Sequence, residues 1–198
     1  METIQTATES MTAASRSYGE EEVLWGKAFK WEIKGVGEDE VWEVTGDFLG
    51  VARWATSLVE SCELIEGEAH KPGCVRRVLV YPQAPGEAST FALEKLLEMD
   101  ALHHRYSYTI LGGSTLPGFS LMQDYVSTFK LSSLRLVYPS AEIDQENGTL
   151  LHWSFVCRPV STLSEEETHN IAFSLYQAAV NDLKARLSLS DDRITLIP

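Results

Sequence analysis

The segment Ser61–Val80 constrains the fold most, because its pattern is that of a β-hairpin with charge on its inner face. Lys71-Pro72-Gly73 predicts the tight turn, since Pro fixes one turn dihedral angle and Gly frees the next. In the second strand Arg76 and Arg77 are adjacent, so one faces the interior of the sheet and the other faces its exterior. A buried arginine needs an anionic or polar partner. The hairpin therefore predicts a sheet with a polar point in an otherwise apolar interior.

The rest of the chain predicts further antiparallel strands around this hairpin. Asn147-Gly148 is a strong hairpin turn, because both residues tolerate positive φ, and it leads into a last strand that contains Trp153. Acids at 38–40 begin a short helix, and 51–58 predicts a second short helix or turn that carries Trp54. Alternating apolar residues predict the other strands, at 25–34, 89–99, 105–111 and 124–137.

A long helix is predicted at the end of the chain, over Ser164–Leu187. Ser164 and Glu167 have the spacing of a capping box. The helix has one apolar stripe in steps of four residues, made by Ile171, Leu175, Ala179, Leu183 and Leu187.

This order of elements predicts an α+β fold, in which a curved, seven-stranded antiparallel sheet grips the long C-terminal helix. Such a sheet and a single helix leave a gap that aromatic side chains from several strands line. Two readings stay open, a ligand cavity and a filled core in which the tyrosine hydroxyls are satisfied locally. The aromatic candidates for the lining are Tyr106, Tyr108, Tyr125, Trp153 and Phe155.

At 198 residues the chain is expected to form one domain over 23–189. Residues 1–22 are rich in Ser, Thr, Ala and Glu, without apolar periodicity, and are predicted to be a disordered tail. They lack the apolar core of a signal peptide, and their acids do not suit a transit peptide. Residues 190–198 are predicted to be a C-terminal tail.

The net charge of −13 speaks against nucleic acid or anionic lipid as the partner. No apolar run approaches the roughly 18 residues of a membrane helix. Cys62, Cys74 and Cys157 are few, odd in number and without a CxxC pair, so reduced thiols in a cytoplasmic protein are expected. His103-His104 has no third ligand at metal-like spacing, and no metal site is expected.

Four groups of motifs extend this reading to a family. The motifs are Trp25-Gly-Lys27; Ser61-Cys-Glu-Leu-Ile-Glu-Gly-Glu-Ala69 with Gly73-Cys-Val-Arg76; Glu94-Lys-Leu96 with Tyr106-Ser-Tyr108; and Trp153-Ser-Phe-Val-Cys157. With these motifs the chain resembles the START-like helix-grip superfamily of pollen-allergen-like proteins, polyketide cyclases and abscisic acid receptors, and within it plant lachrymatory factor synthase. The resemblance covers nearly the whole chain apart from its ends, and the second group of motifs is the most specific.

The resemblance implies a cofactor-free isomerase that converts a short alk-1-enyl sulfenic acid into a thial S-oxide. The catalytic residues that it implies are Arg76, Glu94, Tyr108 and Tyr125. An arginine holds a polarised oxygen, a carboxyl group in an apolar pocket can carry a proton near neutral pH, and tyrosines orient the substrate. The expected ligand contacts are Tyr106, Phe129, Trp153, Phe155, Leu116 and Phe119.

Periodicity disagrees with this assignment at Glu94. In the strand 89–99 the more apolar face contains Phe91, Leu93, Leu97 and Met99, which sends Glu94 to solvent. We follow the resemblance and expect Glu94 to point into the cavity with Arg76.

The alternative function is a non-catalytic protein that binds, carries or senses an apolar plant metabolite. Abscisic acid is not the expected ligand, because Ser114-Thr115 stands where the receptors have His-Arg after their latch glycines. The segments 81–88 and 112–120, rich in Gly and Pro, are expected to border the opening of the cavity as a lid. The partner is a small molecule, and the expected state is a monomer or a weak homodimer.

Overall fold

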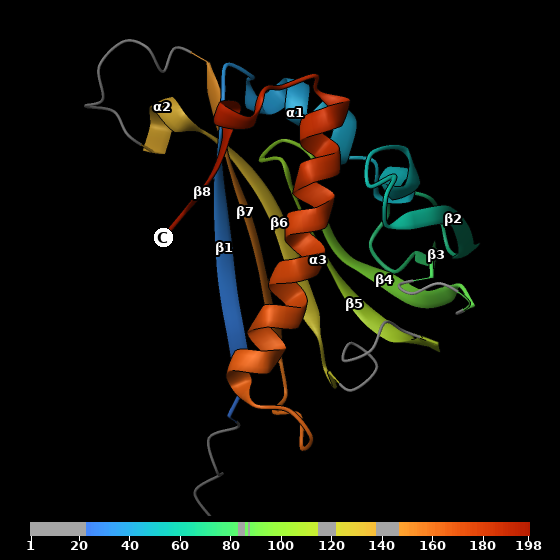
Figure 1. Ribbon diagram of the computed structural model, residues 1–198. Helices are drawn as coiled ribbons and strands as arrows, with labels where there is room; N and C mark the ends of the chain where they lie inside the picture. The colour runs from blue at the N-terminus through green and yellow to red at the C-terminus, as the bar shows by residue number, and fades with distance from the viewer. Residues whose placement is uncertain (1–22, 83–85, 87, 115–121, 138–146) are drawn as a thin grey trace, which may run out of the picture.

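An antiparallel sheet wraps around one long helix in the computed structural model, which describes residues 23–82, 86, 88–114, 122–137 and 147–198 (Figure 1). The sheet has eight strands in the order β2-β3-β4-β5-β6-β7-β1-β8. The strands are β1 (Trp25–Lys34), β2 (Val59–Glu66), β3 (Val75–Val80), β4 (Thr90–Asp100), β5 (Arg105–Ser114), β6 (Val126–Ser133), β7 (Gly148–Cys157) and β8 (Ile194–Ile197). The helices are α1 (Glu38–Thr45), α2 (Leu134–Val137) and α3 (Glu165–Arg186), with 3-10 turns η1 (Phe48–Arg53) and η4 (Asp191–Arg193).

The predicted α+β helix-grip architecture is confirmed, with one more strand than the seven predicted. The additional strand β8 pairs antiparallel with β1, from Ile33 opposite Ile194 to Lys30 opposite Ile197. It lies in the segment predicted to be a tail, where four residues are too few to show a strand period. The segment 124–137 is also shorter as a strand than predicted, because its last four residues form α2.

The hairpin of β2 and β3 forms as its turn residues predict. Gly73 in the turn has φ of 97°, a value that residues with a side chain rarely adopt. Arg76 is buried, and Arg77 faces solvent, where it pairs with Glu63 at 2.9 Å. The period of two in a strand was therefore sufficient to place one arginine inside the sheet.

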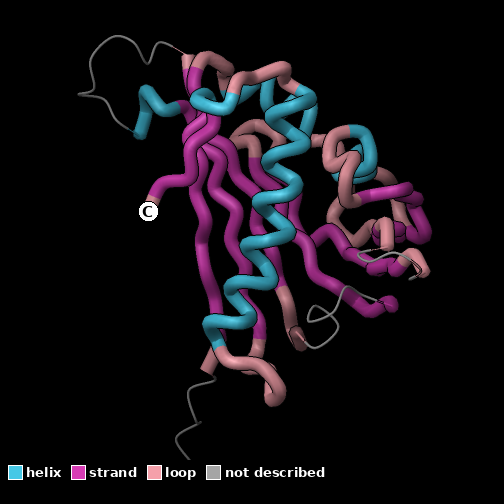
Figure 2. The backbone as a smooth tube through the Cα atoms, in the orientation of Figure 1, coloured by secondary structure: helices cyan, strands magenta, loops and turns pink. Residues whose placement is uncertain are grey.

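The helix α3 lies across the concave face of the sheet (Figures 1 and 2). The predicted capping box is confirmed: the Ser164 hydroxyl accepts from the Glu167 backbone N–H, and the Glu167 carboxylate accepts from the Ser164 N–H at 2.7 Å. These contacts lower the pKa of Glu167.

The buried side of α3 differs from the predicted stripe. Because an α-helix has 3.6 residues per turn, each step of four residues drifts by about 40°, so a stripe of four such steps cannot stay on one face. Ile171, Leu175 and Leu187 are only partly buried. The helix buries instead Thr168, Ala172, Tyr176, Ala179, Val180 and Leu183.

Residues 83–85, 87 and 115–121, which make up most of the two segments predicted to form a lid, lie outside the described residues. Leu116 and Phe119 are among them, so their expected ligand contacts stay predictions. Gly112 and Gly113, predicted to begin the second loop, are part of β5. Among the helices of the described chain, none combines the length and apolarity of a transmembrane span.

We expect Ser164→Ala to lower the midpoint of thermal unfolding by about 2–4 °C at pH 7, because it removes the cap of α3. Since the folded-state pKa of Glu167 lies below its ordinary value of 4.5, the share of this contribution that its carboxylate supplies is present above pH 4.5 and is lost as the pH falls through the lowered pKa. Circular dichroism melts at pH 7 and pH 3 measure both effects. The control is Ser174→Ala in the exposed middle of the same helix, where Ala is the better helix former. An equal effect of both substitutions would contradict the capping role.

Candidate functional site

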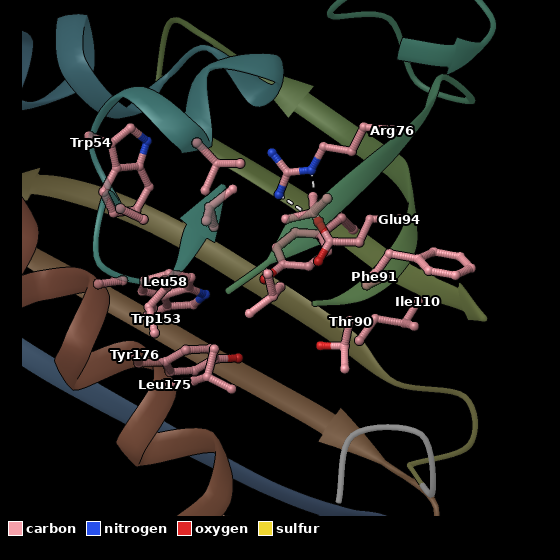
Figure 3. A pocket seen from close by; sticks show the side chains of 18 of the residues that line it. Trp54, Leu58, Arg76, Thr90, Phe91, Glu94, Ile110, Trp153, Leu175 and Tyr176 are labelled. Carbon is pink, nitrogen blue, oxygen red and sulfur yellow. Dashed lines mark hydrogen bonds and ion pairs between the residues drawn. The ribbon is translucent and has the colours of Figure 1, made fainter. Parts of the chain in front are cut away.

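A cavity of about 100 Å³ lies between the concave face of the sheet and α3 (Figure 3). Its described walls come from η1 and the turn after it, from β2 to β5, from Tyr125 and Trp153, and from one side of α3. Most of these side chains are aliphatic or aromatic. An apolar cavity of roughly 150 Å³ is enough to hold benzene. The present cavity is smaller than that, so it suits a compact, largely apolar molecule.

A buried ion pair joins Arg76 and Glu94 in the wall of this cavity (Figure 3). The two residues are directly opposite each other on β3 and β4. Arg76 Nε and Nη2 both contact Glu94 Oε2, at 2.7 and 2.6 Å. The side chains are only 5% and 12% exposed, so the charges are largely removed from water. Glu94 Oε1 makes no hydrogen bond with the described residues.

The backbone of η1 completes the surroundings of Arg76. Arg76 Nη1 donates to the carbonyl oxygen of Phe48, and the guanidinium lies over the Phe48 ring, 3.8 Å from its centroid. The Tyr108 ring lies 5.5 Å from the same group. Burial is the largest single effect and lowers the pKa of Arg76, but the charges of Glu94 and of its neighbours Cys62, Tyr106 and Tyr108 together raise it, and the net shift is upward. Arg76 therefore stays charged, and three of its five N–H groups are engaged.

A β-bulge explains why Glu94 points inward although the apolar pattern of its strand predicts the opposite. The pairing between β4 and β5 shifts between Leu96 and Glu98, so Leu97 is an extra residue. Leu96 is fully buried and Leu97 is 41% exposed. The predicted apolar face joined residues from both sides of this bulge, where the alternation changes phase. Before the bulge, the residues directed to the cavity include Thr90, Ala92 and Glu94.

A second polar group lies on the opposite side of the cavity, where three hydroxyls connect α3 to the sheet. Tyr176 Oη lies 2.5 Å from Tyr125 Oη and 3.0 Å from Ser127 Oγ. Ser127 Oγ also accepts from Trp153 Nε1 at 3.0 Å, and the rings of Trp153 and Tyr176 stack at 4.2 Å. Burial raises the pKa of Tyr125 and of Tyr176, as it does for Tyr106 and Tyr108. All four tyrosines therefore keep their protons.

The structure brings most of the predicted site residues together. Arg76, Glu94, Tyr106, Tyr108, Tyr125 and Trp153 all line the cavity. Phe129 and Phe155 are buried behind the described lining instead. Phe129 stacks on Tyr106 at 5.2 Å, and Phe155 stacks on Tyr125 at 5.7 Å. They support the tyrosines and do not meet the cavity.

Several residues of the site, in the lining or directly behind it, were missed by the sequence reasoning. Tyr176 was missed because the helix stripe was drawn through Ile171 and Leu175, and a strict period of 3.6 from Ala172 to Ala179 would have included it. Ser127 lies two residues from both Tyr125 and Phe129, on the same face of the strand, but nothing in the sequence marks it as the centre of a hydroxyl network. The contribution of η1 and its following turn was also missed, namely Val51, Trp54, Ala55 and Leu58.

The described residues contain no group of three His, Cys, Asp or Glu side chains placed to hold a metal ion. All three cysteines are free thiols. Cys62 lies near the ion pair, and burial raises its pKa to about 11, so this thiol is protonated at neutral pH. The chemistry that the described side chains offer is therefore acid–base and hydrogen-bonding chemistry.

We expect Arg76→Leu to destabilise the fold by about 3–5 kcal/mol, because it leaves the Glu94 carboxylate buried without its partner. The adjacent Arg77 is the matched control, since it sits in the same strand but pairs with Glu63 at the surface. Arg77→Leu should change the free energy of unfolding by about 0–1 kcal/mol. Urea unfolding of both variants measures the difference, and equal losses would show that the buried pair has no special weight.

Ser127→Ala should cost about 1–3 kcal/mol, because it leaves the buried Trp153 N–H and the Tyr176 hydroxyl without their shared partner. Ser154→Ala, at the neighbouring position of β7, is the control, since no hydrogen bond of its hydroxyl is found among the described contacts. The measurement is again the free energy of unfolding. A neutral Ser127→Ala would mean that the hydroxyl cluster does not depend on this residue.

Comparisons with known proteins agree with this fold. Residues 32–188 match the protein family described as polyketide cyclase / dehydrase and lipid transport. XoxI from Bacillus cereus is 23% identical, with a TM-score of 0.59 over 81% of this chain and 94% of its own. An uncharacterised Bacillus thuringiensis protein is 22% identical, with a TM-score of 0.61 over 81% and 97%. Major latex-like protein 151 from Panax ginseng is 15% identical, with a TM-score of 0.60 over 82% and 97%. At these identities the solved structures share the fold.

Proposed function

Since the chain belongs to the polyketide cyclase/dehydrase and lipid transport family, we propose that its cavity binds a small, largely apolar molecule and isomerises it by acid–base chemistry. The proposal includes no cofactor. Among the reactions of this kind, the motifs around Cys62, Arg76 and Glu94 favour the one of lachrymatory factor synthase, which turns an alk-1-enyl sulfenic acid into a thial S-oxide.

The observation that carries the proposal is the position of the ion pair. Arg76 and Glu94 line one cavity, and the arginine contacts only one carboxylate oxygen of Glu94, Oε2. The other oxygen, Oε1, is left for a proton of the ligand. A general base must lie within hydrogen-bond reach of the proton that it removes, and a carboxylate in the lining is accessible to a proton of a ligand in the cavity.

The reaction that we propose is a proton shift within one molecule. Glu94 takes the proton of the S–OH group, and the negative charge spreads over oxygen, sulfur and the far carbon of the C=C bond. That carbon then takes the proton back from Glu94, so the C=C bond is lost, a C=S bond forms and oxygen remains on sulfur. Atoms and electrons balance without a second reactant. Arg76 stabilises the charge that develops on the oxygen, because its guanidinium is fixed and charged beside Glu94.

The neutral tyrosines orient the substrate in this scheme. Tyr108 lies beside the guanidinium of Arg76, and Tyr125 is fixed by the hydroxyl of Tyr176. Because their pKa values are raised by burial, they serve as hydrogen-bonding groups and not as bases. We place the reaction in the cytoplasm, in line with the three free thiols.

A second function, binding or transport without chemistry, is favoured by the contacts of Arg76 within the protein. Its three engaged N–H groups contact Glu94 and the Phe48 carbonyl, as they would in a structural ion pair. In that case the ion pair shapes the cavity and the ligand leaves it unchanged.

Glu94→Gln distinguishes the two functions, because the amide keeps the shape of the side chain but cannot carry the proton. We expect this variant to retain ligand binding and to lose turnover by roughly two or more orders of magnitude. The assay follows thial S-oxide formation from an alk-1-enyl sulfenic acid that is released in situ from its cysteine S-oxide precursor. Binding is followed by native mass spectrometry.

The control is Glu98→Gln on the same strand, where the carboxylate is half exposed and pairs with Arg105 at 2.9 Å. It should leave turnover unchanged. If Glu94→Gln converts the substrate at the wild-type rate, the proposed mechanism is wrong. If the wild-type protein binds such molecules without converting them, the binding function takes its place.

A further inference from the structure

Three buried polar side-chain atoms have no hydrogen-bond partner in the described part of the chain, and two of them belong to the cavity lining. These two are Trp54 Nε1 and Thr90 Oγ1. The third, His169 Nε2, lies on α3, outside the described lining. Thr90 is only partly buried, and its hydroxyl can rotate to donate or to accept. Trp54 is the more informative residue, because an indole N–H can only donate.

The state of Trp54 contrasts with that of other tryptophans in the core. Trp31 donates to Gln177 at 3.1 Å, and Trp153 donates to Ser127 at 3.0 Å. Trp54 is equally buried, at 2% exposure, and its ring packs near Trp153 with centroids 6.3 Å apart. A buried donor without an acceptor costs free energy, and buried indole N–H groups are usually paired. The fold accepts this cost at the wall of its cavity.

The position of the indole makes a ligand the natural acceptor. Trp54 follows η1, whose Phe48 carbonyl is bonded to Arg76. In Figure 3 the nitrogen of Trp54 lies on the edge of the ring nearer to Arg76 and Glu94. A molecule that binds beside the ion pair therefore lies on the side of the ring that carries the Trp54 N–H.

The charges of the cavity lining determine which kind of acceptor group a ligand can place there. The ionic groups of the described lining are Arg76 and Glu94, which neutralise each other, and the rest of the described lining is uncharged. An anion would enter an apolar space without a free counter-charge, against a protein of net charge −13. A neutral oxygen, such as that of a carbonyl or an S-oxide, accepts from the indole without this penalty.

We infer that Trp54 is a specificity-determining residue, and that the cavity selects compact, uncharged ligands whose acceptor oxygen binds the Trp54 indole N–H. This inference rests on the proposed function only in so far as the cavity is a ligand site. It holds whether or not the ligand is converted.

The test compares two probes of the same shape, cyclopentanone and methylenecyclopentane. The ketone has an acceptor oxygen where the hydrocarbon has a methylene group. Indole N–H resonances of the five tryptophans are observed by ¹⁵N–¹H NMR during titration of the full chain. The ketone should move the Trp54 resonance downfield, as hydrogen bonding does, and the hydrocarbon should not. Trp54→Phe should weaken ketone binding about tenfold and leave hydrocarbon binding within about twofold.

The matched control is Trp31→Phe, which removes an indole of the same size whose N–H is already bonded to Gln177 and which is not among the described lining residues. It should unfold at a lower temperature than Trp54→Phe, because only Trp31 loses a hydrogen bond on substitution. It should leave the preference for the ketone in place.

Equal effects of both probes on the Trp54 resonance, or an unchanged affinity ratio in Trp54→Phe, would overturn the inference, as would failure of the ketone to bind. Should Trp54→Phe not fold, the titration of the wild-type chain decides alone. If the wild-type chain shows no preference for the ketone while its turnover still depends on Glu94, only the role of Trp54 is refuted. If it prefers the ketone but its turnover does not depend on Glu94, only the proposed chemistry is refuted.

Discussion

The buried pair of Arg76 and Glu94 is the interaction on which the cavity depends. Taking a guanidinium and a carboxylate out of water costs several kcal/mol per ion, and their attraction offsets this only with good geometry and further hydrogen bonds. The protein supplies both, through two contacts to Glu94 Oε2 and one to the carbonyl of Phe48. Because these contacts join β3, β4 and η1, the pair also holds η1, which forms part of the cavity wall, against the sheet. The buried ion pair and the cavity around it are therefore parts of one structural feature.

The distribution of polar groups follows from this arrangement. The ion pair is attached to β3 and β4, whereas the hydroxyls of Tyr125, Ser127 and Tyr176 connect the other half of the sheet to α3. Between them the described walls are aliphatic and aromatic. A ligand in this space meets charge on one side and neutral hydroxyls on the other, so its orientation is defined even though most of its contacts are apolar.

The sequence was sufficient where a local rule acts without exception, and insufficient where a local irregularity changes the rule. A period of two places one of Arg76 and Arg77 inside and the other outside, and the spacing of Ser164 and Glu167 predicts the cap of α3. The direction of Glu94 could not be read from alternation, because the bulge at Leu97 changes the phase of the strand. The network of Ser127 likewise depends on contacts between β6, β7 and α3, which no single segment of sequence encodes.

The protonation states of the described lining residues leave one side chain that can transfer a proton. Arg76 has a raised pKa, because the effects of Glu94 and of the neighbouring Cys62, Tyr106 and Tyr108 together exceed that of burial, so it does not release its proton. The lining tyrosines have pKa values raised by burial, and a buried tyrosinate would lack a free counter-charge. The cation and the hydroxyls therefore act as fixed donors and orienting groups. Among the described lining residues this leaves the carboxyl group of Glu94 to move a proton, so an isomerase and a carrier with this fold would differ in whether a ligand brings its acidic hydrogen to Oε1.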